Sequence, residues 1–166
     1  MNFKNIVLSG LCGLALTMHA QEIAPINQQL MNAIIACDNQ TVKDVLNAGF
    51  DVNGVLDEGI TPLTFAVMQM LSGNDPRQVI ELLLRAGASS DTCVTLDEET
   101  YTVKELADVC VGIWEFAAQQ CNDGIVELRN SNTDQSDEIG RLEEAHKSCI
   151  EMIEIARDVR DLLELR

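Results

Sequence analysis

The segment Gly59-Ile60-Thr61-Pro62-Leu63-Thr64-Phe65-Ala66 decides the fold of this chain. The hydroxyl of Thr61 can accept a hydrogen bond from a free N–H in the first turn of a helix. Pro62 suits the first helical position, because its φ is already near the helical value and its missing N–H is not needed there. Leu63 and Ala66 are three residues apart and therefore share one face. The segment predicts a helix that begins at Pro62.

A related pattern precedes this segment at a fixed distance. Leu30 lies 33 residues before Leu63, and Ala33 lies 33 residues before Ala66. Gly49 closes the earlier pattern, and Gly87 closes the later one once an insertion is allowed. The T-P-L-x-x-A motif and this period resemble an ankyrin repeat, with Thr64 in the usual place of histidine.

The resemblance implies an all-α fold, a short ankyrin-type stack of helix-turn-helix repeats. Each unit would be two helices closed by a left-handed glycine, and Cys37 falls where the family usually has glycine. Asp75 is predicted to cap a helix with Pro76 at its first position. The expected helices cover residues 30–36, 41–47, 62–69 and 79–85, with a finger-like connection at residues 54–58.

Further along the chain the repeat pattern weakens. In residues 102–107 only the threonine and the final alanine match the motif. The region that follows is either one long helix or a third helix pair broken at Gly112 and at Asn122-Asp123-Gly124. We favour the pair, because Gly124 falls one residue from the expected closing glycine.

The C-terminal region begins with a polar loop at residues 130–135 and continues as a helix over residues 136–165. Its apolar positions follow a 3-4 spacing, with His146 and Arg160 on the same face. A helix that covers the end of a repeat stack explains this pattern most simply. Dimerisation as a coiled coil is the alternative. The predicted division is a stack over 21–129 and a loop with a capping helix over 130–166.

Residues 1–20 have the features of a signal peptide. Lys4 is followed by an apolar run over residues 6–16 and by the small residue Ala20. We predict cleavage after Ala20 and a periplasmic or secreted protein. Lipid attachment at Cys12 is less favoured, because Leu11 precedes it where a small residue is expected. No later segment is apolar for the roughly 18 residues that a membrane span needs, so membrane insertion is not expected.

Charge and cysteine content restrict the partners and the chemistry. The net charge of −16 argues against binding to nucleic acid or anionic membranes and favours a basic partner. Removal of residues 1–20 would leave one histidine, His146, and five cysteines without a C-x-x-C pair: Cys37, Cys93, Cys110, Cys121 and Cys149. We therefore predict no metal and no cofactor. The spacing leaves open which cysteines form disulfides.

The resemblance to ankyrin repeats implies protein binding through finger tips and the exposed face of the first helices. The corresponding positions are Val55, Asp57, Glu58 and Ile60 on the finger, and Met68 and Gln69 on the helix. Apolar residues at the tip could form a binding patch, or the finger could fold back against the long second finger at residues 92–100.

The sequence thus favours an exported protein that binds and restrains a partner protein, for example as an immunity or inhibitor protein. The alternative is a structural or assembly protein that oligomerises through its C-terminal helix, and the expected state is a monomer or weak homodimer. An enzyme would have to rely on His146 and Cys149 alone, so no catalytic site is predicted.

Overall fold

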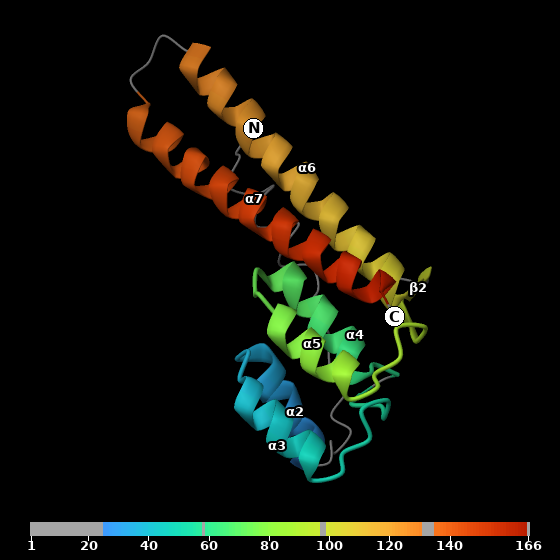
Figure 1. The fold of residues 1–166 in the computed structure, drawn as a ribbon. Helices are drawn as coiled ribbons and strands as arrows, with labels where there is room; N and C mark the ends of the chain where they lie inside the picture. The colour runs from blue at the N-terminus through green and yellow to red at the C-terminus, as the bar shows by residue number, and fades with distance from the viewer. Residues whose placement is uncertain (1–24, 58, 97–98, 131–134, 166) are drawn as a thin grey trace.

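The computed structural model describes residues 25–57, 59–96, 99–130 and 135–165. In these residues the chain forms six α-helices, one short 3-10 helix and a two-stranded sheet. The short helices lie together at one end, and the long helices run antiparallel and extend away from them (Figure 1). A mostly helical fold is therefore confirmed. The predicted signal peptide, and residues 131–134 of the polar loop, lie outside the described residues.

The first helix pair consists of α2 (Pro25–Ile35) and α3 (Asn39–Asn47). Both helices begin earlier than the sequence pattern predicts. Asp38 explains the start of α3, because its carboxylate accepts hydrogen bonds from the N–H groups of Gln40 and Thr41. Hydrogen bonds from these residues lower the pKa of the Asp38 carboxyl. Leu30 and Val42 are completely buried between the two helices and their neighbours.

The second pair consists of α4 (Pro62–Met68), the 3-10 helix η1 (Gln69–Ser72) and α5 (Arg77–Arg85). The predicted cap is confirmed, since Thr61 Oγ1 accepts a hydrogen bond of 3.3 Å from the N–H of Thr64. Asp75 Oδ1 accepts from the N–H of Arg77, so the predicted capping residue of α5 is also present, although the helix begins after Pro76.

Helices α3 and α5 end in the same way. Gly49 and Gly87 have φ values of 93° and 95°, as predicted for left-handed glycines. Beyond them, the N–H of Phe50 donates to the carbonyl of Val45 and the N–H of Ala88 donates to that of Leu83, which is the Schellman pattern. Helix α2 ends likewise at Cys37, whose φ is 50°.

The left-handed conformation predicts the effect of replacing Gly87 by valine. A Cβ atom at Gly87 would meet nothing within 4 Å, so the substitution changes backbone strain and not packing. A β-branched residue resists this conformation, and we expect a loss of about 1 kcal/mol or more in the free energy of unfolding. Denaturant unfolding measures it, with Gly112→Val on an exposed helical site as control. Equal stability of Gly87→Val and the parent would mean that α5 ends differently.

At Cys37, a glycine substitution should be more favourable than an alanine substitution. Its backbone is left-handed, and its Sγ donates to the carbonyl of Asp75 at 3.3 Å. Cys37→Gly and Cys37→Ala both lose that contact, but only glycine relieves the strain. We expect the glycine variant to be more stable than the alanine variant by about 0.5–1 kcal/mol, after the entropic cost of glycine. Denaturant unfolding of the two variants tests this difference, and a more stable alanine variant would contradict it.

A β-hairpin connects the second helix pair to the long helices. It consists of β1 (Cys93–Leu96) and β2 (Glu99–Thr102), which pair antiparallel with Cys93 opposite Thr102. Thr102 then forms a capping box with Glu105. The hydroxyl of Thr102 accepts from the N–H of Glu105 at 3.2 Å, while Glu105 Oε2 accepts from the N–H of Thr102 at 2.8 Å. The long helix therefore begins directly after the hairpin.

The predicted third helix pair is wrong. Residues Val103–Asn130 form a single helix, α6, which runs antiparallel to α7 (Ser136–Glu164). Gly112 and Gly124 lie inside α6, where each glycine costs about 1 kcal/mol relative to alanine. Gly124 has a packing role that explains its presence, because a Cβ there would lie 3.1 Å from Leu142 Cδ1. Pairing with α7 therefore outweighs the local tendency to break.

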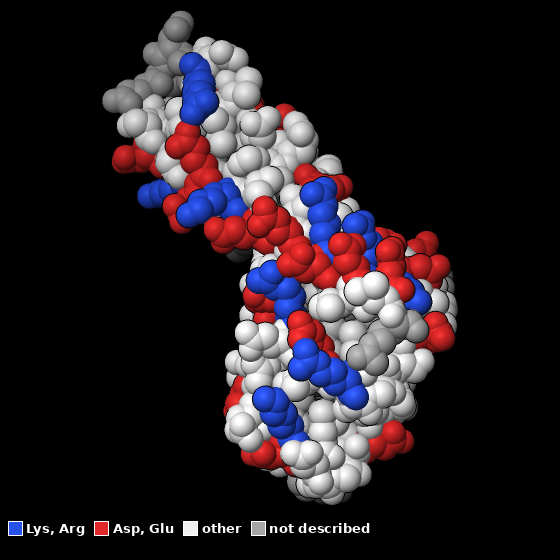
Figure 2. Space-filling model, viewed as in Figure 1, with Lys and Arg blue, Asp and Glu red and all other residues white. Residues whose placement is uncertain are grey.

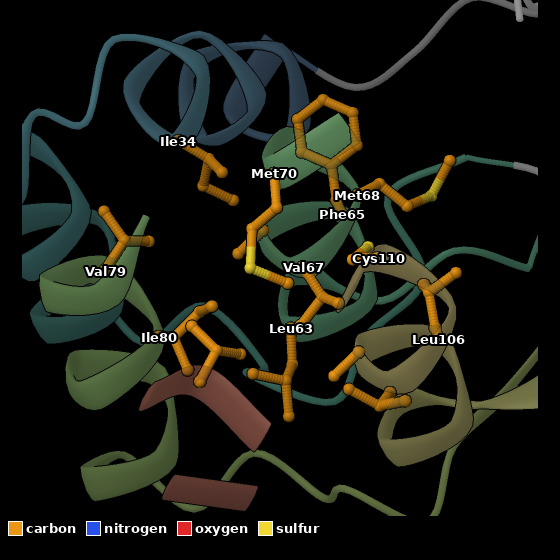
Figure 3. Packing of buried hydrophobic residues seen from close by; sticks show 14 of the residues in the cluster. Ile34, Leu63, Phe65, Val67, Met68, Met70, Val79, Ile80, Leu106 and Cys110 are labelled. Carbon is orange, nitrogen blue, oxygen red and sulfur yellow. The ribbon is translucent and has the colours of Figure 1, made fainter. Parts of the chain in front are cut away.

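The base of the α6–α7 hairpin packs on the second helix pair. The indole N–H of Trp114 donates to the carbonyl of Met70 at 3.0 Å, and Arg77 forms an ion pair of 2.6 Å with Asp158. Figure 3 shows Leu106 and Cys110 of α6 beside Leu63 and Val67 of α4 in the buried cluster. Both long helices thus cover the end of the short helix pairs, where the sequence predicts a single capping helix.

Ion pairs mark the register of the hairpin along one edge. Arg129 pairs with Glu143 at 2.5 Å near the free end, and Arg157 pairs with Glu115 at 2.6 Å nearer the base. Figure 2 shows acidic and basic side chains next to each other along the visible edge of the hairpin. Such exposed pairs contribute little to stability, but they show which residues of the two helices lie side by side.

Candidate functional site

The connection between the two helix pairs, residues 51–60, forms a finger with two tight turns. In the first, the N–H of Gly54 donates to the carbonyl of Asp51 at 2.8 Å. In the second, the N–H of Leu56 donates to the carbonyl of Ile60 at 2.8 Å, and the N–H of Ile60 donates to that of Asp57 at 2.7 Å. Gly59 has φ of 86°, which this turn requires.

Two asparagine side chains hold the finger in place. Asn27 of α2 donates from Nδ2 to the carbonyl of Leu56 at 2.9 Å. Asn53 donates to the carbonyl of Gly87 at 3.1 Å and accepts from the N–H of Ser89 at 2.8 Å. The sequence pattern predicts neither role. The partners of both asparagines are distant in the sequence. Only Asn53, which follows Asp51-Val52, belongs to the repeat-like pattern.

The finger exposes only part of the predicted binding patch. The side chain of Val55 is 55% exposed, and Asp57 is half-buried. Leu56 and Ile60 are buried, so the expectation that Ile60 is available to a partner is wrong. Both side chains belong to the buried apolar cluster, which explains the difference from the expected exposure. Glu58 lies outside the described residues.

The predicted helical part of the patch is also buried. Met68 and Gln69 are at most 9% exposed, and the same holds for every residue of α4. Gln69 is further engaged in hydrogen bonds, since Nε2 donates to the carbonyl of Phe65 and Oε1 accepts from Asn74. Helix α4 lies among α2, α5 and α6, and Leu63 and Phe65 point to opposite sides of it (Figure 3). The predicted exposure of Met68 and Gln69 is therefore wrong, because neighbouring elements bury both side chains.

The long hairpin presents apolar side chains that sequence reasoning missed. Phe116 is 65% exposed and Ile113 is 40% exposed, both on α6. On the edge that carries the ion pairs, Val126 of α6 and Ile150 of α7 are also exposed. These exposed residues could not be predicted because the sequence did not indicate that α6 is one continuous helix. The face on which a residue lies can be assigned only when the bounds of its helix are known.

The described residues offer little for metal or nucleophilic chemistry. Within them, no group of three histidine, cysteine or acidic side chains is placed to hold a metal ion. Burial raises the pKa of the Cys149 thiol to about 11 and that of Cys110 to about 12. A catalytic cysteine needs a lowered pKa, so the position of Cys149 one turn from His146 gives no activated nucleophile.

Among the helices of the described residues, none combines the length and apolar character that crossing a membrane requires. Comparison with known proteins finds no family model that matches the sequence and no curated protein that is similar to it.

Proposed function

We propose that this chain is an exported ankyrin-type module that binds a partner protein and restrains it, as an inhibitor or immunity protein does. The observation that carries the proposal is the finger at residues 51–60, which the side chains of Asn27 and Asn53 hold in place and which presents Val55 beside Asp57. The repeated Schellman ends of α3 and α5 and the spacing of 33 residues between Leu30 and Leu63 support the repeat interpretation.

The anchored finger suits binding because little conformational freedom is left to lose. The hydrogen bonds of Asn27 and Asn53 fix its backbone before any partner arrives. A preorganised contact loses less entropy on association than a mobile one. Val55 can supply an apolar contact, and Asp57, together with the overall charge of −16, favours a basic partner and faster association.

Export is part of the proposal and has its own test. Mass spectrometry of the protein from its host should find a new N-terminus close to Gln21. An intact Met1, or a lipid on Cys12, would refute export with cleavage after Ala20. Either result would leave the binding proposal to be tested separately.

The binding test begins with affinity capture from the periplasm and uses two finger variants. Val55→Asp should speed dissociation of the captured partner about tenfold for each 1.4 kcal/mol lost, because it removes an apolar contact. Asp57→Lys should slow association and weaken its dependence on salt. Surface plasmon resonance separates the two rates, and circular dichroism first confirms that both variants fold.

Phe116→Asp is the matched control for this test, because Phe116 is also an exposed apolar residue but lies on α6. It should leave binding unchanged. Unchanged binding by both finger variants, together with loss in Phe116→Asp, would show that the hairpin and not the finger meets the partner.

The second candidate is assembly through the long helices, which the exposure of Ile113 and Phe116 favours. The predicted coiled-coil seam of α7 is already occupied, since Cys149, Ile153 and Ala156 are buried in the hairpin with α6. Self-association would therefore use the outer face of α6. Sedimentation of the parent and of Phe116→Asp tests this, and a dimer present only in the parent would favour assembly.

A further inference from the structure

Two thiols face each other inside the long hairpin. Cys121 of α6 and Cys149 of α7 are 5% and 7% exposed, and both belong to the faces that the two helices turn toward each other. Cys121 shares its face with Trp114 and Ile125, and Cys149 shares its face with Ile153 and Ala156. Neither thiol has a part in the proposed binding surface.

The register of the hairpin brings these two residues to the same level. The ion pair between Arg129 and Glu143 lies on one side of them along the hairpin, and the ion pair between Glu115 and Arg157 lies on the other. Cys121 lies about two turns from Arg129, and Cys149 lies about two turns from Glu143 in the opposite chain direction. Two antiparallel helices therefore place the cysteines opposite each other.

Small residues lie in the interface between the two helices at this level. Gly124 is one turn from Cys121, and a Cβ added to it would lie only 3.1 Å from Leu142 Cδ1. Ala118 and Ala156 are buried in the same interface. Small residues allow the short separation that a disulfide requires, with Cβ atoms about 3.5–4.5 Å apart. The Cys149 thiol is close enough to Cys121 that the latter contributes, after burial, to the raised pKa of Cys149.

We propose that Cys121 and Cys149 form a reversible disulfide that joins the two long helices. A small disulfide compound or a protein disulfide is the oxidant. One thiolate of the pair attacks it and releases one thiol, and the second cysteine then attacks the mixed disulfide and releases the other. The two cysteine sulfurs are oxidised, the oxidant is reduced to two thiols, and two protons leave the cysteines.

The other described cysteines are placed less well for pairing. Cys110 is buried near the base of α6 beside α4, Cys37 donates to the carbonyl of Asp75, and Cys93 is exposed on β1. The proposal depends on the suggested export only for the natural source of oxidant. A test on the purified full chain supplies its own oxidant, so failure of the export or binding proposal would not affect it.

The disulfide would close a loop between residues 121 and 149. Such a link restricts the unfolded chain, so the oxidised protein should melt at a temperature higher by about 5 °C or more than the reduced protein. Dithiothreitol should reverse the rise. Burial should make the reaction slow, because each thiolate is exposed to the oxidant only when the hairpin opens.

The experiment incubates the full chain with glutathione disulfide under native conditions and digests it with trypsin and chymotrypsin. Chymotrypsin cleaves at Trp114 and Phe116, and so separates Cys110 from Cys121. Mass spectrometry should find Cys121 linked to Cys149, and the linked protein should show the raised melting temperature. The same oxidation of Cys110→Ser should give both results, whereas Cys121→Ser and Cys149→Ser should show neither.

Two outcomes would overturn the proposal. One is that the pair stays reduced, or that either member joins another cysteine, while the exposed Cys93 is fully oxidised. The other is that the link forms but lowers the melting temperature, which would mean that the hairpin must distort to accept it. Because the peptide analysis uses the parent chain, the test remains decisive even if a serine variant folds poorly.

Discussion

Replacing Trp114 by alanine is expected to lower the free energy of unfolding by about 3–5 kcal/mol. The indole is 8% exposed and lies where α6 meets η1. Alanine would leave a cavity at this junction and would also leave the carbonyl of Met70 without the indole donor. Because small domains are stable by only about 5–15 kcal/mol, such a loss is a large part of the total.

The measurement is denaturant unfolding followed by far-ultraviolet circular dichroism, since Trp114 is the only tryptophan and its fluorescence disappears with the substitution. Trp114→Phe is the control. It keeps most of the apolar contact and loses the hydrogen bond, so its loss should be near the 1 kcal/mol typical of one such bond, plus a smaller packing term. A loss below 1 kcal/mol for alanine would mean that the long helices do not depend on this junction.

Leu63→Ala is expected to cost about 2–5 kcal/mol. Leu63 is completely buried in the first turn of α4, and that helix contacts α2, α5 and α6. Its removal therefore opens a cavity that no single neighbour can fill by moving. The free energy of unfolding, measured with urea, gives the loss directly.

Leu82→Ala provides the matched comparison. Leu82 is only half-buried on α5, so the same chemical change should cost clearly less there. Equal losses in the two variants would show that α4 is not the central helix of the short pairs. A larger loss at Leu82 would place the centre of the core on α5.

Local chemistry explains which parts of the fold the sequence could predict. The start of α4 depends on Thr61 and Pro62, and the ends of α3 and α5 depend on Gly49 and Gly87. Each of these helix ends depends on residues that lie within one or two turns of each other. The corresponding helices were therefore predicted to within a few residues.

Other parts depend on contacts between distant segments, and there the sequence was misleading. Gly112 and Gly124 indicate a break locally, but α7 stabilises α6 as one helix across both. The exposure of Ile60, Met68 and Gln69 depends on which elements lie around α4. Only Val55 and Asp57 of the described candidate residues remain at the surface, and the asparagines that hold their finger bond to partners far along the chain.

The long hairpin has a consequence for how motion is distributed in the molecule. At 1.5 Å per residue, α6 extends for about 40 Å, and only its first part lies against the short helices. Among the described elements, α7 is the only neighbour of the free end, where few of the described side chains are fully buried. Backbone amides there should exchange with solvent through small openings, whereas those of α4 should exchange only when much of the chain unfolds. One end of the protein would thus open and close many times during the lifetime of the folded other end.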